Sequence, residues 1–291
     1  VYGLAIDLGS TTIAAQLCDM NTGEVIATAA AMNPQIRFGE DLMSRVSYVM
    51  MNEGGDLAMT KVVREAFNQL ASRAAKSAGI QVDEILDLVV VANPIMHHLF
   101  LGIDPTPLGT APFTLATDQT TVIRASDIDL HLHPEARVCI LPCIAGHIGA
   151  DTAGVILSER PDLSEEYVLL VDVGTNAEIV LANRNRMLAA SSPTGPAFEG
   201  AQITAGQRAA PGAIERVRIN PETLEPRFRV IGCDVWSDDP EFAEKSAKVG
   251  VSGVCGSGII EVVAEMYLAG IIDQDGVIGL VDGKDNSRVI L

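Results

Sequence analysis

Aromatic residues are scarce in this chain of 291 residues, at 4%, so the core has to be built from aliphatic side chains. No run approaches the roughly 18 uninterrupted apolar residues of a membrane-spanning helix, and no basic-then-apolar signal peptide opens the chain. Positively charged residues are also few: the chain has 20 Lys and Arg against 38 Asp and Glu, which gives a formal net charge of −18. Nucleic acids and anionic membranes are bound through clustered cations, so this balance argues against both as partners.

Cysteines are few and poorly spaced for a metal centre. The chain has five, and only Cys139 and Cys143 lie close together, without a further Cys or His to complete a zinc or iron–sulfur spacing. We expect reduced thiols in a cytoplasmic protein, most of them in the core, with a metal role for this pair as the less favoured alternative. A Walker A loop is absent too, so a phosphate site has to be of another kind.

The sequence does contain an acid in an awkward place. Residues 4–6 and residues 13–17 are typical of two buried strands, yet Asp7 ends the first one, where an unpaired carboxylate is costly. Between the strands, a glycine permits a tight turn and lets an anion approach the backbone N–H groups, and hydroxyls offer further hydrogen bonds. The residues of this turn are Gly9, Ser10, Thr11 and Thr12.

The same pattern returns about one domain length later. "LLVDVGTN" (169–176) matches "LAIDLGST" (4–11): a strand ends in Asp, Gly follows two residues on, and a second apolar strand leaves. One hairpin alone is compatible with a plain turn, but two in register indicate duplicated lobes that bind polyphosphate. Asp7 and Asp172 then face the phosphates through Mg²⁺ and its water shell. The second set of phosphate-binding candidates is Gly174, Thr175 and Asn176.

A third glycine-rich stretch, "GVSGVCGSGIIEVVAEMYLAG" (250–270), leads into a predicted helix. A helix N-terminus lined by small residues can receive an anion on its exposed N–H groups. The candidates there are Gly256, Ser257 and Gly258.

The paired hairpins resemble those of the actin, sugar-kinase and heat-shock ATPase superfamily. The resemblance implies an α/β fold of two ribonuclease-H-like lobes, with mixed sheets flanked by helices and the nucleotide between them. We expect the first lobe at 1–160 and the second at 161–291. "GHIGADTAGV" (146–155) resembles the first connecting helix of that fold, which implies that Asp151 contacts Mg²⁺ or positions the attacking water.

Longer segments resemble a narrower family, the ATP-dependent reductive activators of corrinoid proteins. They are "NPQIRFGEDLMSRV", "VVVANPIMHHLFLGIDP", "VDVGTNAEIVL", "SSPTGPAFEGAQITAGQRAAPGAI" and "GVCGSGIIEVV". The resemblance implies ATP and Mg²⁺ as cofactors and a corrinoid protein or corrinoid-dependent methyltransferase as partner, whose Co(II) is returned to Co(I). It implies that Asp7 and Asp172 mark the two phosphate sites, that Glu199 and Gly200 form a turn near the nucleotide, and that 256–258 line the same pocket.

Two departures from the family pattern stand out. Family members carry an N-terminal 2Fe-2S domain whose cysteine spacing is absent here, and they continue to a glycine-rich turn that closes on the adenosine. We therefore expect that the chain, which starts at Val1 and not at Met, is a piece of a longer protein. The 2Fe-2S cluster is then expected only in a missing N-terminal domain, with the second lobe incomplete at its C-terminal end.

Two other functions stay open, a small-molecule kinase of the same superfamily and a docking module with a vestigial nucleotide site; a homodimer is also open. His97 and His98 either lie on a short helix at a domain edge, which is the favoured structural interpretation, or contact a partner's cobalt or corrin. Arg208 pairs either with phosphate or with the acidic surface, and Trp236 belongs either to the core or to a contact patch.

Overall fold

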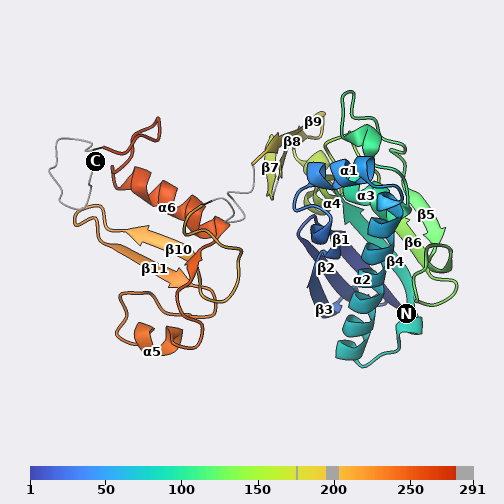
Figure 1. Cartoon of the computed structure of the whole chain (residues 1–291), viewed down its shortest axis with the longest axis horizontal. Coiled ribbons are helices and arrows are strands. Elements are labelled where there is room, and N and C mark those ends of the chain that lie inside the picture. The colour runs from blue at the N-terminus through green and yellow to red at the C-terminus, as the bar shows by residue number, and fades with distance from the viewer. Residues whose placement is uncertain (175, 195–202, 280–291) are drawn as a thin grey trace. The chain divides into compact units, whose positions relative to one another are not determined.

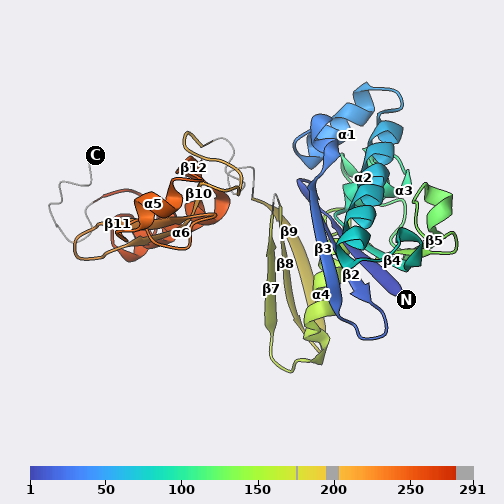
Figure 2. The same cartoon turned by 90° about the horizontal axis from the view of Figure 1, so that it is seen from below.

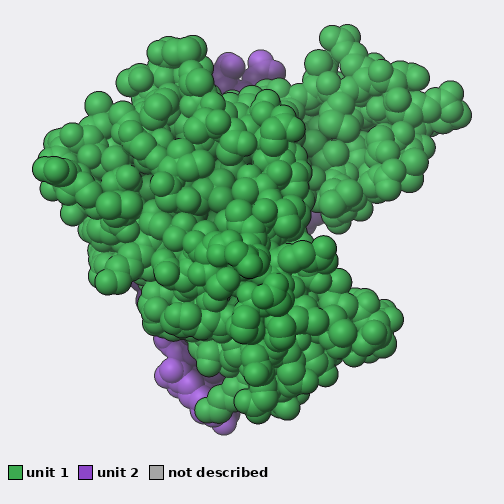
Figure 3. Space-filling view, turned by 90° about the vertical axis from the view of Figure 1, so that its right-hand side faces the viewer, with its two compact units in different colours: residues 1–172, 178–192 green, residues 173–177, 193–291 purple. Residues whose placement is uncertain are grey.

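The computed structural model describes residues 1–174, 176–194 and 203–279. Its contacts separate the chain into two compact units, Val1–Asp172 with Glu178–Ser192 and Val173–Ala177 with Pro193–Leu291. These units are green and purple in Figure 3, and each is described on its own. The lobe boundary expected at residue 160 stays a prediction.

A six-stranded mixed sheet forms the centre of the first unit (Figure 1), in the order β3-β2-β1-β4-β6-β5. β1, β2 and β3 are joined by short turns and are antiparallel to their neighbours. β4 runs parallel to β1, and β6 runs parallel to β4, because the connections that contain helices return the chain to the end of the sheet where the previous strand began. The strands are β1 (Tyr2–Leu8), β2 (Thr12–Asp19), β3 (Val25–Met32), β4 (Ile85–Ala92), β5 (Thr121–Arg124) and β6 (Arg137–Ile140).

Side chains of β1 alternate between the two faces of this sheet. Leu4, Ile6 and Leu8 are buried, whereas Ala5 and Asp7 are exposed on the other face. Helix α2 packs along the buried face, α1 and α3 pack against α2, and α4 packs against β4; Figure 2 shows the sheet from another side. The helices are α1 (Leu42–Met51), α2 (Gly55–Ala78), α3 (Pro94–Leu101) and α4 (Ala150–Glu159), with short 3-10 helices η1 (Pro34–Arg37), η2 (Val82–Glu84), η3 (Thr106–Leu108), η4 (Ala125–Ile128) and η5 (Pro161–Leu163).

The core of the first unit is largely aliphatic, as its composition predicts. Its few aromatic members include Phe67 of α2 and Phe100 of α3, whose rings stack with centroids 4.7 Å apart. Around them lie buried Leu, Ile, Val, Met and Ala side chains from the sheet and from α2. The buried face of the sheet therefore carries most of the core, and Asp7 lies on the opposite face.

A second sheet contains the repeated hairpin. It has the order β7-β8-β9, with β7 (Val168–Val173), β8 (Asn176–Asn183) and β9 (Arg186–Pro193). Asp172 is the last residue but one of β7, as Asp7 is of β1. Both acids therefore stand at equivalent points of their hairpins, as the sequence pattern indicates.

The second unit is built on β10 (Ala213–Ile219), β11 (Pro226–Val230) and β12 (Gly253–Val254), in the order β11-β10-β12. Helix α5 (Phe242–Ser246) is short, and α6 (Gly256–Leu268) packs along β10. Glu261 accepts a hydrogen bond from the backbone N of Val217 at 2.8 Å, and Glu265 accepts one from that of Ile219 at 2.9 Å. Carboxylates of α6 thus accept hydrogen bonds from backbone N–H groups along an open edge of β10.

Within the described ranges, no helix combines the length and the apolar composition needed to cross a membrane.

Candidate functional site

The turn between β1 and β2 forms the first predicted phosphate site. Gly9, Ser10 and Thr11 connect the strands, and a Cβ on Gly9 would lie 2.6 Å from the carbonyl oxygen of Thr12. The turn therefore excludes a side chain at this glycine. Asp7 precedes the turn and lies on the sheet face opposite to α2.

Helix α4 brings Asp151 to the same face of the sheet. In the sheet register Asp7 lies opposite Val91 of β4, and a Cβ added to Gly154 of α4 would lie 3.1 Å from that valine side chain. Asp151 stands in the first turn of α4, where its Oδ1 accepts a hydrogen bond from the backbone N of Thr152 at 2.7 Å. The connecting helix therefore presents its acid beside β1.

The acids of this region influence one another's protonation. Burial, and then repulsion by Asp172, raises the pKa of Asp7, although part of its side chain still meets solvent. Burial raises the pKa of Asp151 to about 6, with Asp7 and Asp172 adding to the rise. Burial and repulsion by Asp151 raise the pKa of Glu178 to about 7, although Ser191 Oγ donates a hydrogen bond to its Oε1 at 3.2 Å. We call Asp7, Asp151, Asp172 and Glu178 the carboxylate cluster.

The carboxylate cluster gathers negative charge from four elements, β1, α4, β7 and β8. Like charges held together are unfavourable unless protons or cations neutralise them. Among the described residues, no three acids, histidines or cysteines are placed to hold a metal ion together. Carboxylate oxygens are ligands that Mg²⁺ accepts, commonly with several of its waters retained.

Glu178 is the member of the cluster that sequence reasoning missed. It lies on β8 within the segment "VDVGTNAEIVL", between buried Ala177 and buried Val180. Asp7 ends an apolar strand, whereas Glu178 lies within one, and a carboxylate is costly in either setting unless it is paired.

The other predicted phosphate-binding residues lie in several places. The backbone N of Gly174 donates to the carbonyl oxygen of Asn176 at 2.8 Å, which closes the second turn. Gly256, Ser257 and Gly258 begin α6 in the second unit, where Cys255 is the N-cap. A Cβ on Gly258 would lie 2.3 Å from the carbonyl oxygen of Ile214, so this glycine is needed for packing against β10. Thr175, Glu199 and Gly200 lie outside the described residues.

The two adjacent histidines are core residues. His97 and His98 are 0% and 1% exposed, and burial lowers the pKa of both, that of His97 to about 4. His98 Nδ1 lies 2.8 Å from the Pro94 carbonyl oxygen, and its Nε2 accepts from the backbone N of Ala116 at 3.0 Å. Both side chains are thus buried on the short helix α3, which supports the structural interpretation and argues against a corrin contact through them.

The structure also describes the surroundings of three other residues considered from the sequence. Burial raises the pKa of Cys143 to about 12, so this residue stays a thiol and is a poor metal ligand. Arg208 is exposed. Trp236 is half-buried beneath two guanidinium groups, with Arg227 at 4.8 Å and Arg218 at 6.0 Å from its ring centroid.

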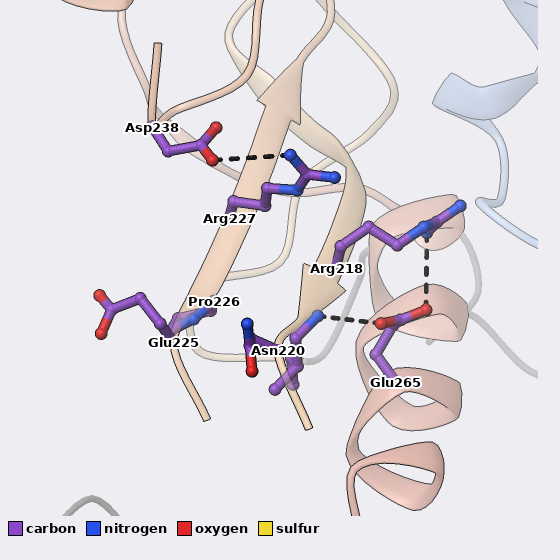
Figure 4. A pocket seen from close by; sticks show the side chains of 8 residues that line it. Arg218, Asn220, Glu225, Pro226, Arg227, Asp238 and Glu265 are labelled. Atoms are coloured by element: carbon purple, nitrogen blue, oxygen red, sulfur yellow. Dashed lines mark hydrogen bonds and ion pairs between the residues drawn. The ribbon is translucent and has the colours of Figure 1, made fainter. Parts of the chain in front are cut away.

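A hollow of about 520 Å³ lies in the second unit at the ends of β10 and β11 (Figure 4). Its cations are already paired, because Arg227 lies 3.6 Å from Asp238 and Arg218 lies 3.8 Å from Glu265. The residues that line it include none of the predicted site residues that the structure describes. This hollow is therefore separate from the predicted phosphate chemistry.

Comparison with known proteins finds two family models along the chain. The model of the RACo middle region matches residues 2–162, and the model of the C-terminal domain of RACo, the ASKHA domain, matches residues 166–290. ASKHA denotes the actin, sugar-kinase and heat-shock ATPase superfamily. The predicted α/β fold class and the predicted superfamily are thereby confirmed.

Individual relatives agree with these models. The corrinoid activation enzyme RamQ of Eubacterium limosum is 32% identical over 276 residues, which are 95% of this chain and 43% of that protein. The Co(II) methylated amine-specific corrinoid protein reductase of Methanosarcina barkeri is 28% identical over 295 residues, 94% of this chain and 52% of that protein. A solved reductive activator for corrinoid, iron-sulfur protein is 36% identical with a TM-score of 0.78, covering 96% of this chain and 42% of the other. The chain thus spans about half the length of these relatives.

Proposed function

Because the chain belongs to the RACo family, we propose that it is the module that binds and hydrolyses ATP to drive reduction of Co(II) to Co(I) in a corrinoid protein. The observation that carries the nucleotide part of this proposal is the carboxylate cluster. Asp7 adjoins a turn that excludes a side chain at Gly9, and the acids of the cluster repel one another, a repulsion that a bound cation would relieve. That combination fits a magnesium–polyphosphate complex.

In this proposal each acid has its own role. Asp7 and Asp172 would hold hydrated Mg²⁺, which would neutralise charge on the phosphate groups. Asp151 orients the attacking water and accepts its proton, for which a pKa of about 6 is suitable near neutral pH. Glu178, with a pKa of about 7, is partly protonated near neutral pH and would lose that proton if a cation bound beside it.

The hairpin turns supply the polyphosphate contacts. The turn of residues 9–12 offers backbone N–H groups and the hydroxyls of Ser10, Thr11 and Thr12, and the sequence repeats this pattern at Gly174, Thr175 and Asn176. In this proposal ATP hydrolysis controls the reaction with the partner, and no metabolite is phosphorylated. We therefore expect ATP hydrolysis to be slow without the partner. The partner is a corrinoid protein or a corrinoid-dependent methyltransferase, and the iron–sulfur cluster belongs to another part of the protein.

The proposal is tested by following Co(I) formation in the complete protein. A Co(II) corrinoid protein and a low-potential reductant are mixed with it, with and without Mg-ATP, while Co(I) absorbance and phosphate release are recorded. We expect Co(I) to accumulate only with Mg-ATP, and ATP hydrolysis to rise when the Co(II) protein is added. Absence of both effects, together with phosphorylation of a sugar or an acid, would establish the kinase alternative instead.

A further inference from the structure

Helix α1 carries an arginine on its apolar stripe. Leu42, Val46 and Val49 recur at helical spacing, and Arg45 falls on the same stripe. The structure buries Arg45 completely, at 0% exposed. A guanidinium keeps its charge in proteins, and burying a charge is costly, so packing alone does not explain an arginine here.

The guanidinium of Arg45 lies behind the first phosphate turn. Its Nη2 donates to the carbonyl oxygen of Ser10, and its Nε donates to that of Gly39 at 2.9 Å. Its Nη1 lies 3.5 Å from Gln35 Oε1 and 3.0 Å from Met96 Sδ. The positive charge is therefore fixed between α1, η1, α3 and the turn that joins β1 to β2.

Asn33 holds the same turn from the same side. It is 1% exposed, and its Nδ2 donates to the carbonyl oxygen of Gly9 at 2.8 Å. Its backbone N donates to the carbonyl oxygen of Thr11, also at 2.8 Å. Together with the bond from Arg45 to Ser10, this means that three successive carbonyl groups of the turn are bound by two buried residues.

Binding of these carbonyl groups decides which way the turn faces. In a planar trans peptide, the N–H of the next residue points away from the carbonyl oxygen, so inward carbonyls direct the following N–H groups outward. Carbonyl oxygens repel an anion, whereas successive N–H groups attract one. Resting on the proposed function, we propose that Arg45 and Asn33, braced by Gln35, are positioning residues that preform the turn for phosphate and place a positive charge behind it.

Arg64 provides a matched control. Its side chain is 14% exposed, and its Nε and Nη2 donate to the carbonyl oxygen of Phe100 at 3.0 and 2.9 Å. Like Arg45, it is a largely buried arginine that binds backbone carbonyl groups in the first unit. None of its described hydrogen bonds reaches the turn.

The test compares Arg45→Met, Arg45→Lys and Arg64→Met with the unchanged protein. Dissociation constants of Mg-ATP and of Mg-tripolyphosphate are measured by calorimetry on the complete protein, and melting temperatures are measured without ligand. We expect Arg45→Met to weaken both ligands by about 10- to 100-fold, the range for loss of a charged partner. Arg45→Lys keeps the charge without the planar fork and should regain part of this loss. Arg64→Met should lower the melting temperature with affinities changed by less than about 2-fold.

Each outcome separates the inference from its premise. Equal affinity losses in Arg45→Met and Arg64→Met would show that Arg45 acts only through stability and would overturn the inference. If Arg45→Met does not fold, the comparison of Arg45→Lys with Arg64→Met decides by the same criterion. If the unchanged protein binds Mg-ATP and the Arg45 variants bind it equally well, the inference alone fails. If the unchanged protein binds no Mg-ATP, the proposed function fails and the inference fails with it.

Discussion

At the scale of single residues, Asp7, Asp151 and Glu178 retain their protons to a higher pH than free carboxyl groups do. Raised pKa values mean that the folded protein binds more protons than the unfolded chain. For Glu178, the free energy of unfolding therefore falls as pH rises from its unfolded pKa of about 4.5 to its folded pKa of about 7. A bound cation reverses this because it favours the ionised carboxylates. The cluster is therefore suited to ligand binding at the expense of stability.

Proton release on nucleotide binding follows from these pKa values. At pH 6.5, Glu178 is mostly protonated and Asp151 partly so, and binding of Mg-ATP should release about one proton. At pH 8.5 both groups are already ionised, and the release should vanish. Calorimetry in two buffers of different ionisation enthalpy measures the number of protons. Proton uptake, or no exchange at pH 6.5, would contradict these roles, and Glu178→Gln should reduce the release.

The residue scale is also where sequence reasoning was least complete. Asp7 and Asp172 could be found because an acid at the end of an apolar strand is rare and because it occurs twice. Glu178 lies within an apolar strand, but its partners come from α4 and β7, and only the folded chain shows them. Arg45 sits at a helical spacing that predicts burial, yet a sequence does not reveal that three successive carbonyls need donors.

At the scale of secondary-structure elements, α4 depends on a close approach to β4. A Cβ on Gly149, the N-cap of α4, would lie 2.4 Å from the carbonyl oxygen of Ala92 and 2.7 Å from Asp151 Oδ1. Backbone cannot yield to such a contact without moving the helix. Glycine at this position therefore sets where Asp151 stands relative to β1.

Substitution at this position gives a prediction for the element. Gly149→Ala should lower the free energy of unfolding by about 1–3 kcal/mol and weaken Mg-ATP binding, because α4 has to shift. Gly154→Ala is the matched control in the same helix: its Cβ would meet only the Val91 side chain, at 3.1 Å, and alanine favours the helix. We expect its stability to change by less than about 1 kcal/mol. Chemical denaturation measures both, and equal effects would show that Gly149 has no special role.

Hairpins and the apolar core are predictable from the sequence because both depend on local patterns. Strand β1 covers Tyr2–Leu8 and β2 covers Thr12–Asp19, close to the strands expected around Asp7. The edge of β10 was not predictable in this way. It is satisfied by Glu261 and Glu265, which follow about forty residues later and read from the sequence as an ordinary solvated helix face.

At the scale of the whole molecule, the chain matches only part of each relative. Those relatives are about twice its length, and matching segments run along nearly the whole chain. Under the proposed function, reduction of cobalt also requires an electron donor and a corrinoid partner. The contribution proposed for this chain is therefore the coupling of Mg-ATP to that reaction.

Asp7→Asn tests this account most directly, with Asp83→Asn, an exposed aspartate in η2, as the control for the change in charge. Because burial and Asp172 raise the pKa of Asp7, neutralising it should leave the melting temperature at pH 7.5 unchanged or higher. The same change should weaken Mg-ATP binding by at least about 30-fold, whereas Asp83→Asn should leave it unaltered. An Asp7→Asn protein that is less stable and binds Mg-ATP as tightly as before would contradict the account.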